Sequence, residues 1–119
     1  MKIYYYIQDT SHEVPAEKPM EATIVEARLI LNSLHETGNF LGAELSSDRV
    51  LQFYAQEGVI WLEILHIVQQ TTNGCEVTLP IADLALEAAY QGNDIPTALR
   101  DAGFDWLDWH LTKLDSIDQ

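Results

Sequence analysis

The side chains that could do chemistry are few, and their spacing does not favour catalysis. The four histidines are scattered along the chain, at His12, His35, His66 and His110. None belongs to a His-x-His or His-Glu-x-x-His pattern, which would place two ligands on one side of a metal ion. We expect each to be a surface or half-buried residue. No metal site and no cofactor is predicted.

The candidate nucleophiles lead to the same interpretation. Ser46-Ser47-Asp48 lacks the Gly-x-Ser-x-Gly elbow that exposes a catalytic serine. Cys75 precedes Glu76, whose charge disfavours the reactive thiolate. The glycines stand singly, so no loop is rich enough in glycine to cradle a phosphate. Carboxylate pairs such as Asp105 and Asp108 are expected by chance in so acidic a chain. We therefore predict that the protein is not an enzyme.

Charge is the most informative feature of the composition. Nineteen acidic residues face six basic ones, for a net charge of −13. The excess grows along the chain, because eleven carboxylates but only two cations, Arg100 and Lys113, follow Arg49. A chain of this charge is repelled by nucleic acid and by anionic membranes and is attracted to basic partners. The charge therefore favours a protein partner with a basic surface.

Length and hydropathy indicate one globular unit. A chain of 119 residues that is 47% hydrophobic is predicted to form a single domain over residues 1–119, with a substantial core. The lone Cys75 excludes an internal disulfide, which is typical of a reducing cytoplasm. The apolar stretch Ile3–Ile7 is too short for a signal peptide, and no apolar run approaches membrane-spanning length. We expect a cytoplasmic protein.

A central hairpin is the clearest structural element. Val50–Gln56 and Val59–His66 are separated by Glu57-Gly58, which suits a two-residue turn between antiparallel strands. This turn fixes a register that pairs Tyr54 with Trp61 and places Gln52 opposite Glu63. Because side chains alternate along a strand, one face becomes wholly apolar and must belong to the core. Its members are Leu51, Phe53, Ala55, Ile60, Leu62 and Ile64.

The remaining segments predict an α+β fold, an antiparallel β-sheet covered on one face by helices. Thr23 and Glu26 fit a capping box at the start of a helix that Gly38 would end. Pro80 suits the first turn of a second helix, which Gly92 would end. The other expected elements are strands over Ile3–Ile7, Phe40–Leu45 and 76–79, an exposed loop over Asp9–Pro19, a polar turn over Gln69–Gly74, a short helix from Asp94 to near Gly103, and a tail helix over Phe104–Leu114.

Two surfaces are candidates for binding a partner. The first is the non-core face of the hairpin, where Tyr54, Trp61 and Glu63 form a mixed aromatic and polar surface. Tyr and Trp dominate interface hot spots because they cover much area at low entropic cost. The alternative is that a second layer, made of the C-terminal helices or a loop, packs over this face. Tyr54 and Trp61 would then be ordinary core residues.

The second surface is the C-terminal segment, which alternates acids with large aromatic residues. Carboxylates there could contact Arg or Lys of a partner while an indole fills an apolar pocket or stacks on a cation. The alternative is a terminal helix docked through its apolar stripe, with the acids merely solvated. The residues of this candidate surface are Asp101, Asp105, Trp106, Asp108 and Trp109.

Read in order, the chain resembles the polymorphic-toxin immunity proteins of the first-numbered bacterial immunity family, over roughly residues 23–106. The similarity is carried by a helix followed by strands and a second strand-to-helix block, while the first twenty residues and the Trp-rich tail have no counterpart. The matching segments are Thr23–Glu36, Phe40–Leu45, Arg49–Tyr54, Gly58–Glu63, Glu76–Ile81 and Gly92–Pro96.

The resemblance implies an inhibitor that binds a cognate secreted toxin and occludes its active site, with an acidic, aromatic surface against a basic cleft. Two other classes of function remain open from the residues alone. One is an acidic mimic of nucleic acid that inhibits a DNA- or RNA-binding protein. The other is a small assembly subunit that pairs through an exposed strand or the tail.

Overall fold

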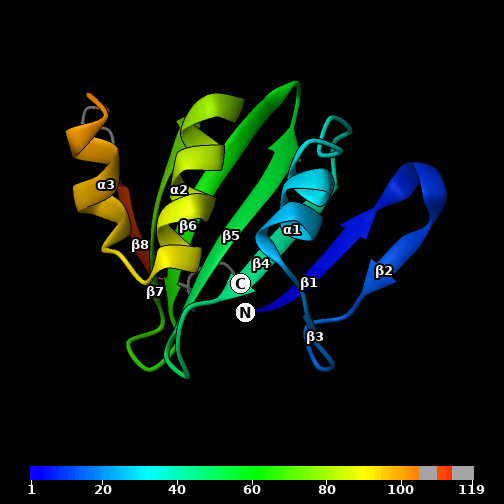
Figure 1. Cartoon of the computed structure of the whole chain (residues 1–119), viewed down its shortest axis with the longest axis horizontal. Helices are drawn as coiled ribbons and strands as arrows, with labels where there is room; N and C mark the ends of the chain where they lie inside the picture. The colour runs from blue at the N-terminus through cyan, green and yellow to red at the C-terminus, as the bar shows by residue number, and fades with distance from the viewer. Residues whose placement is uncertain (105–109, 114–119) are drawn as a thin grey trace.

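The protein has an α+β fold in which helices cover one face of an antiparallel sheet (Figure 1). The computed structural model describes residues 1–104 and 110–113. Within these ranges the strands are β1 (Lys2–Ile7), β2 (His12–Val14), β3 (Met20–Glu21), β4 (Phe40–Glu44), β5 (Arg49–Gln56), β6 (Val59–His66), β7 (Thr71–Val77) and β8 (His110–Lys113). The helices are the 3₁₀ turn η1 (Gln8–Thr10) and the α-helices α1 (Ile24–Leu31), α2 (Leu79–Gln91) and α3 (Ile95–Asp101).

The eight described strands form one sheet in the order β2-β1-β4-β5-β6-β7-β8, and β3 also pairs with β1. Every pairing is antiparallel. The central hairpin is confirmed in its predicted register, with Tyr54 opposite Trp61 and Gln52 opposite Glu63. Glu57 and Gly58 both have positive φ, at 52° and 84°, as this tight turn requires.

The hydrophobic core lies between the sheet and the helices. Leu51, Phe53 and Leu62 of the hairpin are fully buried there, as their alternation predicts. They belong to one cluster with the buried side chains of all three α-helices. The same cluster holds Leu31 of α1, Leu86 of α2 and Leu99 of α3. The helices therefore share one side of the sheet, and no described helix lies on the other side.

Helix α1 begins as predicted and ends early. The Glu26 amide donates to the Thr23 hydroxyl (3.2 Å), and the Thr23 amide donates to the Glu26 carboxylate (2.9 Å), which completes the capping box. The helix ends at Leu31 rather than at Gly38. Asn32 and Ser33 donate from their side chains to the carbonyls of Arg28 and Leu29. These bonds satisfy carbonyls of the last helical turn, beside the backbone bond from the Asn32 amide to the Arg28 carbonyl.

The second half of the chain confirms two predicted helices and corrects one other prediction. Helix α2 carries a proline in its first turn and ends at Gly92, which is left-handed. The Asp94 side chain accepts from the Thr97 amide and caps α3. The predicted polar turn over 69–74 is wrong, since β7 begins at Thr71 and the turn ends at Gln70, which has positive φ.

Two predictions near the chain ends also need correction. The segment Asp9–Pro19, predicted to be a loop, contains part of η1 and all of β2. Residues 12–14 are a strand because they pair with the edge of β1. The tail helix predicted for 104–114 is wrong at its described end: His110–Lys113 is strand β8, paired with β7. Without them β7 would expose one backbone edge, and residues 110–113 pair with that edge. This pairing outweighs the helical spacing of the apolar residues.

Candidate functional site

The face of the sheet opposite the helices, here called the open face, carries a row of aromatic side chains. The strand register places Tyr6, Phe40, Tyr54 and Trp61 side by side across β1, β4, β5 and β6. The ring centroids of Tyr6 and Phe40 are 6.2 Å apart, and those of Tyr54 and Trp61 are 6.5 Å apart. All four side chains are half-buried. Aromatic pairs at this spacing stabilise one another and form a stiff, amphipathic surface.

A chain of polar side chains runs beside the aromatic row. The Tyr4 hydroxyl donates to Gln52 Oε1 (2.7 Å), and Gln52 Nε2 donates to Glu63 Oε1 (3.0 Å). The Thr72 hydroxyl donates to the other carboxylate oxygen of Glu63 (3.3 Å). The four residues come from β1, β5, β6 and β7, so the network spans most of the sheet. It holds the Glu63 carboxylate in place on the open face.

Two strand glycines let large rings lie flat on this face. A Cβ at Gly42 would overlap the ring of Tyr4, which is only 8% exposed. A Cβ at Gly74 would lie 2.7 Å from Nε1 of Trp61. Neither glycine has positive φ, so close approach of a side chain explains them rather than backbone conformation. The rings of Tyr4 and Trp61 thus rest on bare backbone.

The carboxylate of Glu63 determines the electrostatics at the centre of the open face. Burial raises the pKa of Glu63 above its ordinary value, although the hydrogen bonds from Thr72 and Gln52 oppose the shift. Burial, reinforced by the charge of Glu63, raises the pKa of Tyr4 to about 12 and that of Tyr54 to about 12. In the described part of the chain, Glu63 has no cationic partner.

On the helical side, in contrast, acidic side chains form ion pairs. There Arg28 of α1 contacts Asp83 (2.8 Å) and Glu87 (3.2 Å) of α2, so a cation neutralises the acids. Among the residues of β1 to β7, the register places one Lys or Arg on the open face, Lys2 at a corner near Glu44. The open face therefore presents negative charge with little internal compensation.

Replacing Glu63 by glutamine is expected to raise the melting temperature at neutral pH. For an acid with a raised pKa in the folded state, stability falls as the pH rises from the unfolded pKa through the folded pKa, and the loss persists above it. Glutamine keeps a hydrogen-bonding amide without the buried charge. The gain in melting temperature should shrink as the pH falls towards 4.5, which is the ordinary pKa of a glutamate side chain. Thermal unfolding across this pH range measures it.

The matched control is Glu76→Gln, which removes one charge from an exposed position on the same face, opposite Trp61. A gain for Glu63→Gln that is no larger than the control's, or that does not depend on pH, would contradict the burial argument.

A hollow of about 390 Å³ opens at one end of the open face. Its walls include Tyr4, Phe40 and Gln52 from the sheet, together with residues of the loop that follows β2. Pro15 and Ala16 lie in that loop, flanked by the exposed acids Glu13 and Glu17. The rings of Tyr4 and Phe40 are edge to face here, with centroids 6.2 Å apart.

The structure brings together three of the predicted binding residues and separates a fourth from them. Tyr54, Trp61 and Glu63 lie on the open face, where no described helix covers them. Asp101 is exposed at the end of α3, in the helical layer on the other side of the sheet. The others fall outside the described residues: Asp105, Trp106, Asp108 and Trp109.

Several residues of the open face are missing from the sequence prediction. Tyr4, Tyr6, Phe40 and Thr72 join it only through the pairing of β1 with β4 and of β6 with β7. One signal was available for the first pairing. Tyr4-Tyr5-Tyr6 puts two aromatic rings on the same face of a strand, and Phe40 begins the next predicted strand.

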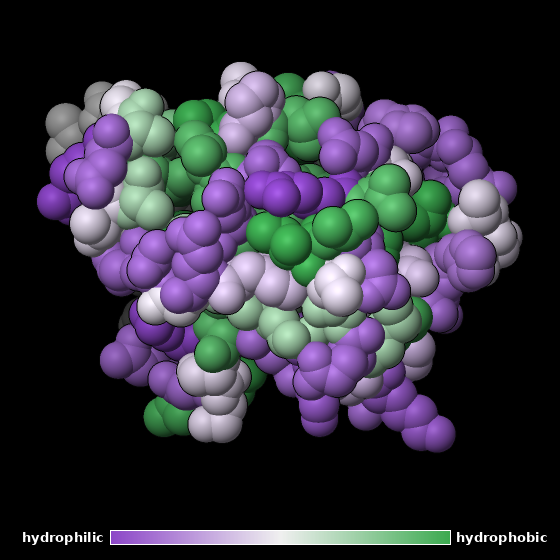
Figure 2. All heavy atoms as spheres, in the orientation of Figure 1, coloured by the Kyte–Doolittle hydropathy of each residue, from purple (hydrophilic) through white to green (hydrophobic). Residues whose placement is uncertain are grey.

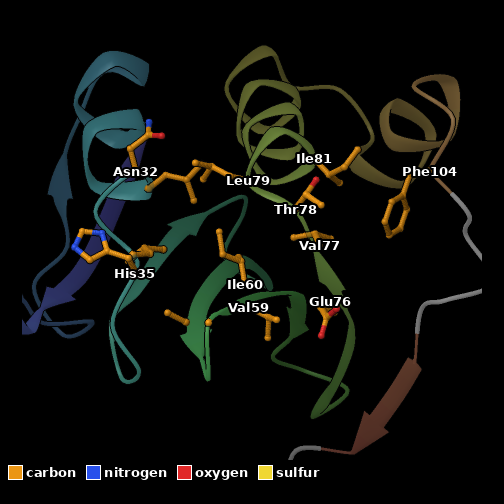
Figure 3. Close-up of a pocket in the computed structure, with 14 residues that line it drawn as sticks. Asn32, His35, Val59, Ile60, Glu76, Val77, Thr78, Leu79, Ile81 and Phe104 are labelled. Carbon is orange, nitrogen blue, oxygen red and sulfur yellow. The ribbon is translucent and has the colours of Figure 1, made fainter.

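The helical side of the molecule offers a second, more apolar surface. Figure 2 shows apolar residues breaking the hydrophilic surface over α1, where Val25 is 63% and Leu29 67% exposed. A cavity of about 560 Å³ lies between the end of α1, the turn of the hairpin and the start of α2 (Figure 3). His35 stands on one side of it and Glu76 on the other, with apolar side chains such as Ile60 between them. No close acid–base pair forms across this cavity.

Three further findings concern function. Over residues 1–104 and 110–113, no three His, Cys, Asp or Glu side chains are grouped to hold a metal ion. No helix within these ranges is long and apolar enough to cross a membrane. Comparisons with protein-family models, with curated proteins and with solved structures gave no match to any of them.

Proposed function

We propose that this chain is a non-catalytic immunity protein that binds and occludes a cognate secreted toxin through the open face of its sheet. The observation that carries the proposal is the row of half-buried aromatic rings beside the carboxylate of Glu63, which has no cationic partner among the residues that the structure describes. Such a surface fits a partner that presents basic and apolar groups together. A toxin domain that acts on nucleic acid or on an anionic nucleotide has this character at its active site.

The aromatic row is suited to slow dissociation. Tyr54 and Trp61 are already held by one another and by the flat backbone at Gly74, so they lose little freedom when a partner covers them. Their half-buried state also leaves area for a partner to bury. Affinity differences between related complexes lie mostly in the dissociation rate, which such anchors control.

The charge is suited to fast association. A net charge of −13 attracts a basic partner over a distance and aligns it during the encounter. Steering of this kind raises association rates from about 10⁵–10⁶ M⁻¹s⁻¹ for uncharged pairs towards about 10⁸–10⁹ M⁻¹s⁻¹ at low salt. An immunity protein must capture its toxin before the toxin acts in the cytoplasm of the producing cell.

The polar network supports binding rather than catalysis. Both oxygens of the Glu63 carboxylate accept hydrogen bonds from neighbouring side chains. Burial raises the pKa of Tyr4 to about 12, which moves this hydroxyl further from ionisation, and it donates to Gln52. These groups hold a fixed surface and provide no activated nucleophile.

The proposal is tested by co-expressing the chain with the product of the neighbouring toxin gene and purifying the pair. We expect a stable complex in which the toxin is inactive, and an association rate that falls steeply with salt. A chain that fails to bind that product would contradict the immunity function. Inhibition of an unrelated DNA- or RNA-binding protein would instead favour the nucleic-acid mimic, and a symmetric homodimer through the same face would favour the assembly subunit.

A further inference from the structure

The hollow at the end of the open face differs from the rest of the surface because it combines aromatic walls with acids. Tyr4 and Phe40 provide two rings, and Gln52 provides an amide between the hollow and Glu63. Glu13 of β2 and Glu17 of the following loop line the same hollow. Its volume of about 390 Å³ lies within the range of about 300–1,000 Å³ that is usual for small-ligand sites.

The chemistry of these walls selects a planar cation. A guanidinium stacks on aromatic faces and donates to carboxylates in a fork, so it matches both features at once. An ammonium would satisfy the carboxylates but stack less well. None of the described ion pairs involves Glu13 or Glu17, so both carboxylates can accept a partner's cation.

The geometry points to this hollow as the receptor for an arginine side chain of the protein partner, with the guanidinium against the half-buried ring of Phe40 and near the carboxylates of Glu13 and Glu17, while the buried ring of Tyr4 supports Phe40. This assignment rests on the proposal that the open face binds a protein. It adds the identity of one contact residue of the partner, an arginine that would bind at the end of the aromatic row. The occupied hollow would extend the covered surface from β6 to the loop after β2.

The test uses a minimal probe, N-acetyl-arginine amide, titrated into the whole ¹⁵N-labelled protein and followed by NMR. We expect saturable shifts of the backbone amides of Tyr4, Phe40 and Gln52, and of the four residues around Pro15 that carry an N–H, namely Glu13, Val14, Ala16 and Glu17. N-acetyl-citrulline amide, which has a similar shape without the charge, should cause no such shifts. Shifts that are absent, or that are the same with citrulline, would overturn the assignment.

Two variants separate charge from aromatic stacking. Glu13→Gln with Glu17→Gln should weaken the arginine probe about three- to tenfold, the sum of two exposed ion pairs. Phe40→Leu should weaken it about two- to fivefold by removing one ring and keeping the apolar bulk. The matched control, Glu57→Gln with Glu76→Gln, makes the same change in net charge away from the hollow and should leave the affinity unchanged. Equal weakening in the control would show general charge attraction and overturn the assignment.

The probe experiment fails or succeeds independently of the immunity function. If arginine binds in the hollow but no toxin complex forms, the arginine site is supported and the proposed immunity function is contradicted. A stable toxin complex whose affinity is unchanged by the Glu13→Gln, Glu17→Gln pair would retain the function and remove the arginine anchor.

Discussion

Replacing Trp61 by alanine is expected to weaken the complex with the cognate toxin by about 30-fold or more. The loss corresponds to the roughly 2 kcal/mol or more that defines an interface hot spot. Trp61 lies at the end of the aromatic row, half-buried against Tyr54 and the backbone of Gly74. Its indole is thus fixed before binding, so truncation removes area without an entropic gain. Surface plasmon resonance with the purified toxin domain measures the change, which should appear mainly in the dissociation rate.

The matched control carries Val25→Ala and Leu29→Ala on the helical side. These apolar side chains are more exposed than Trp61, so they would dominate if the partner bound over α1. We expect the control to bind like the wild type. Thermal unfolding of each variant separates lost binding from lost folding. A Trp61→Ala protein that is folded and binds with unchanged affinity would exclude the open face.

Replacing Gly42 by alanine is expected to destabilise the fold by about 1–3 kcal/mol, the usual cost of forcing extra volume into a packed site. A Cβ there overlaps the ring of Tyr4, which would have to leave its buried position and its hydrogen bond to Gln52. The backbone at Gly42 does not have positive φ, so the alanine itself adds no conformational strain. Urea denaturation measures the change in the free energy of unfolding.

A double-mutant cycle identifies the cause. In a Tyr4→Ala background the ring is absent, so Gly42→Ala should cost little or even stabilise the strand. If the glycine substitution costs as much in that background as in the wild type, the contact with Tyr4 is not the reason for the glycine.

The hairpin shows what could be read from local pattern. Its turn and its strict alternation determine which residues face the core, and the structure confirms the pairing of Tyr54 with Trp61. Half of the candidate site follows from that register alone, including Glu63. The signal was strong because a shift of one residue would put Leu51, Phe53 and Leu62 into water.

The other half of the site depends on contacts between distant segments. Tyr4 reaches Gln52 across 48 positions of the chain, and the aromatic residues of the two segments do not by themselves establish that β1 lies beside β4. Gly74 falls in the predicted polar turn and Gly42 in a predicted strand, yet both occupy strand interiors, where a ring lies over each of them. Only tertiary packing distinguishes these two uses of glycine.

The composition gives the sign of the net charge but not the positions of the charged side chains on the surface. The structure pairs Asp83 and Glu87 with Arg28 on the helical side, whereas Glu63 on the open face forms no ion pair within residues 1–104 and 110–113. The sequence analysis assigns Asp101 to the second candidate surface, in the C-terminal segment, and α3 holds this residue in the layer opposite the open face. Folding therefore separates acids with different roles that composition cannot distinguish.

Hydroxyl-radical footprinting of the chain, alone and in complex with the toxin domain, tests the binding face most directly, because it reports the solvent exposure of individual side chains. Burial of the open face predicts that Tyr6, Phe40, Tyr54 and Trp61 lose reactivity in the complex while Val25 and Leu29 keep theirs. Protection of Val25 and Leu29, with the four aromatic residues unchanged, would place the partner on the helical side and contradict the account.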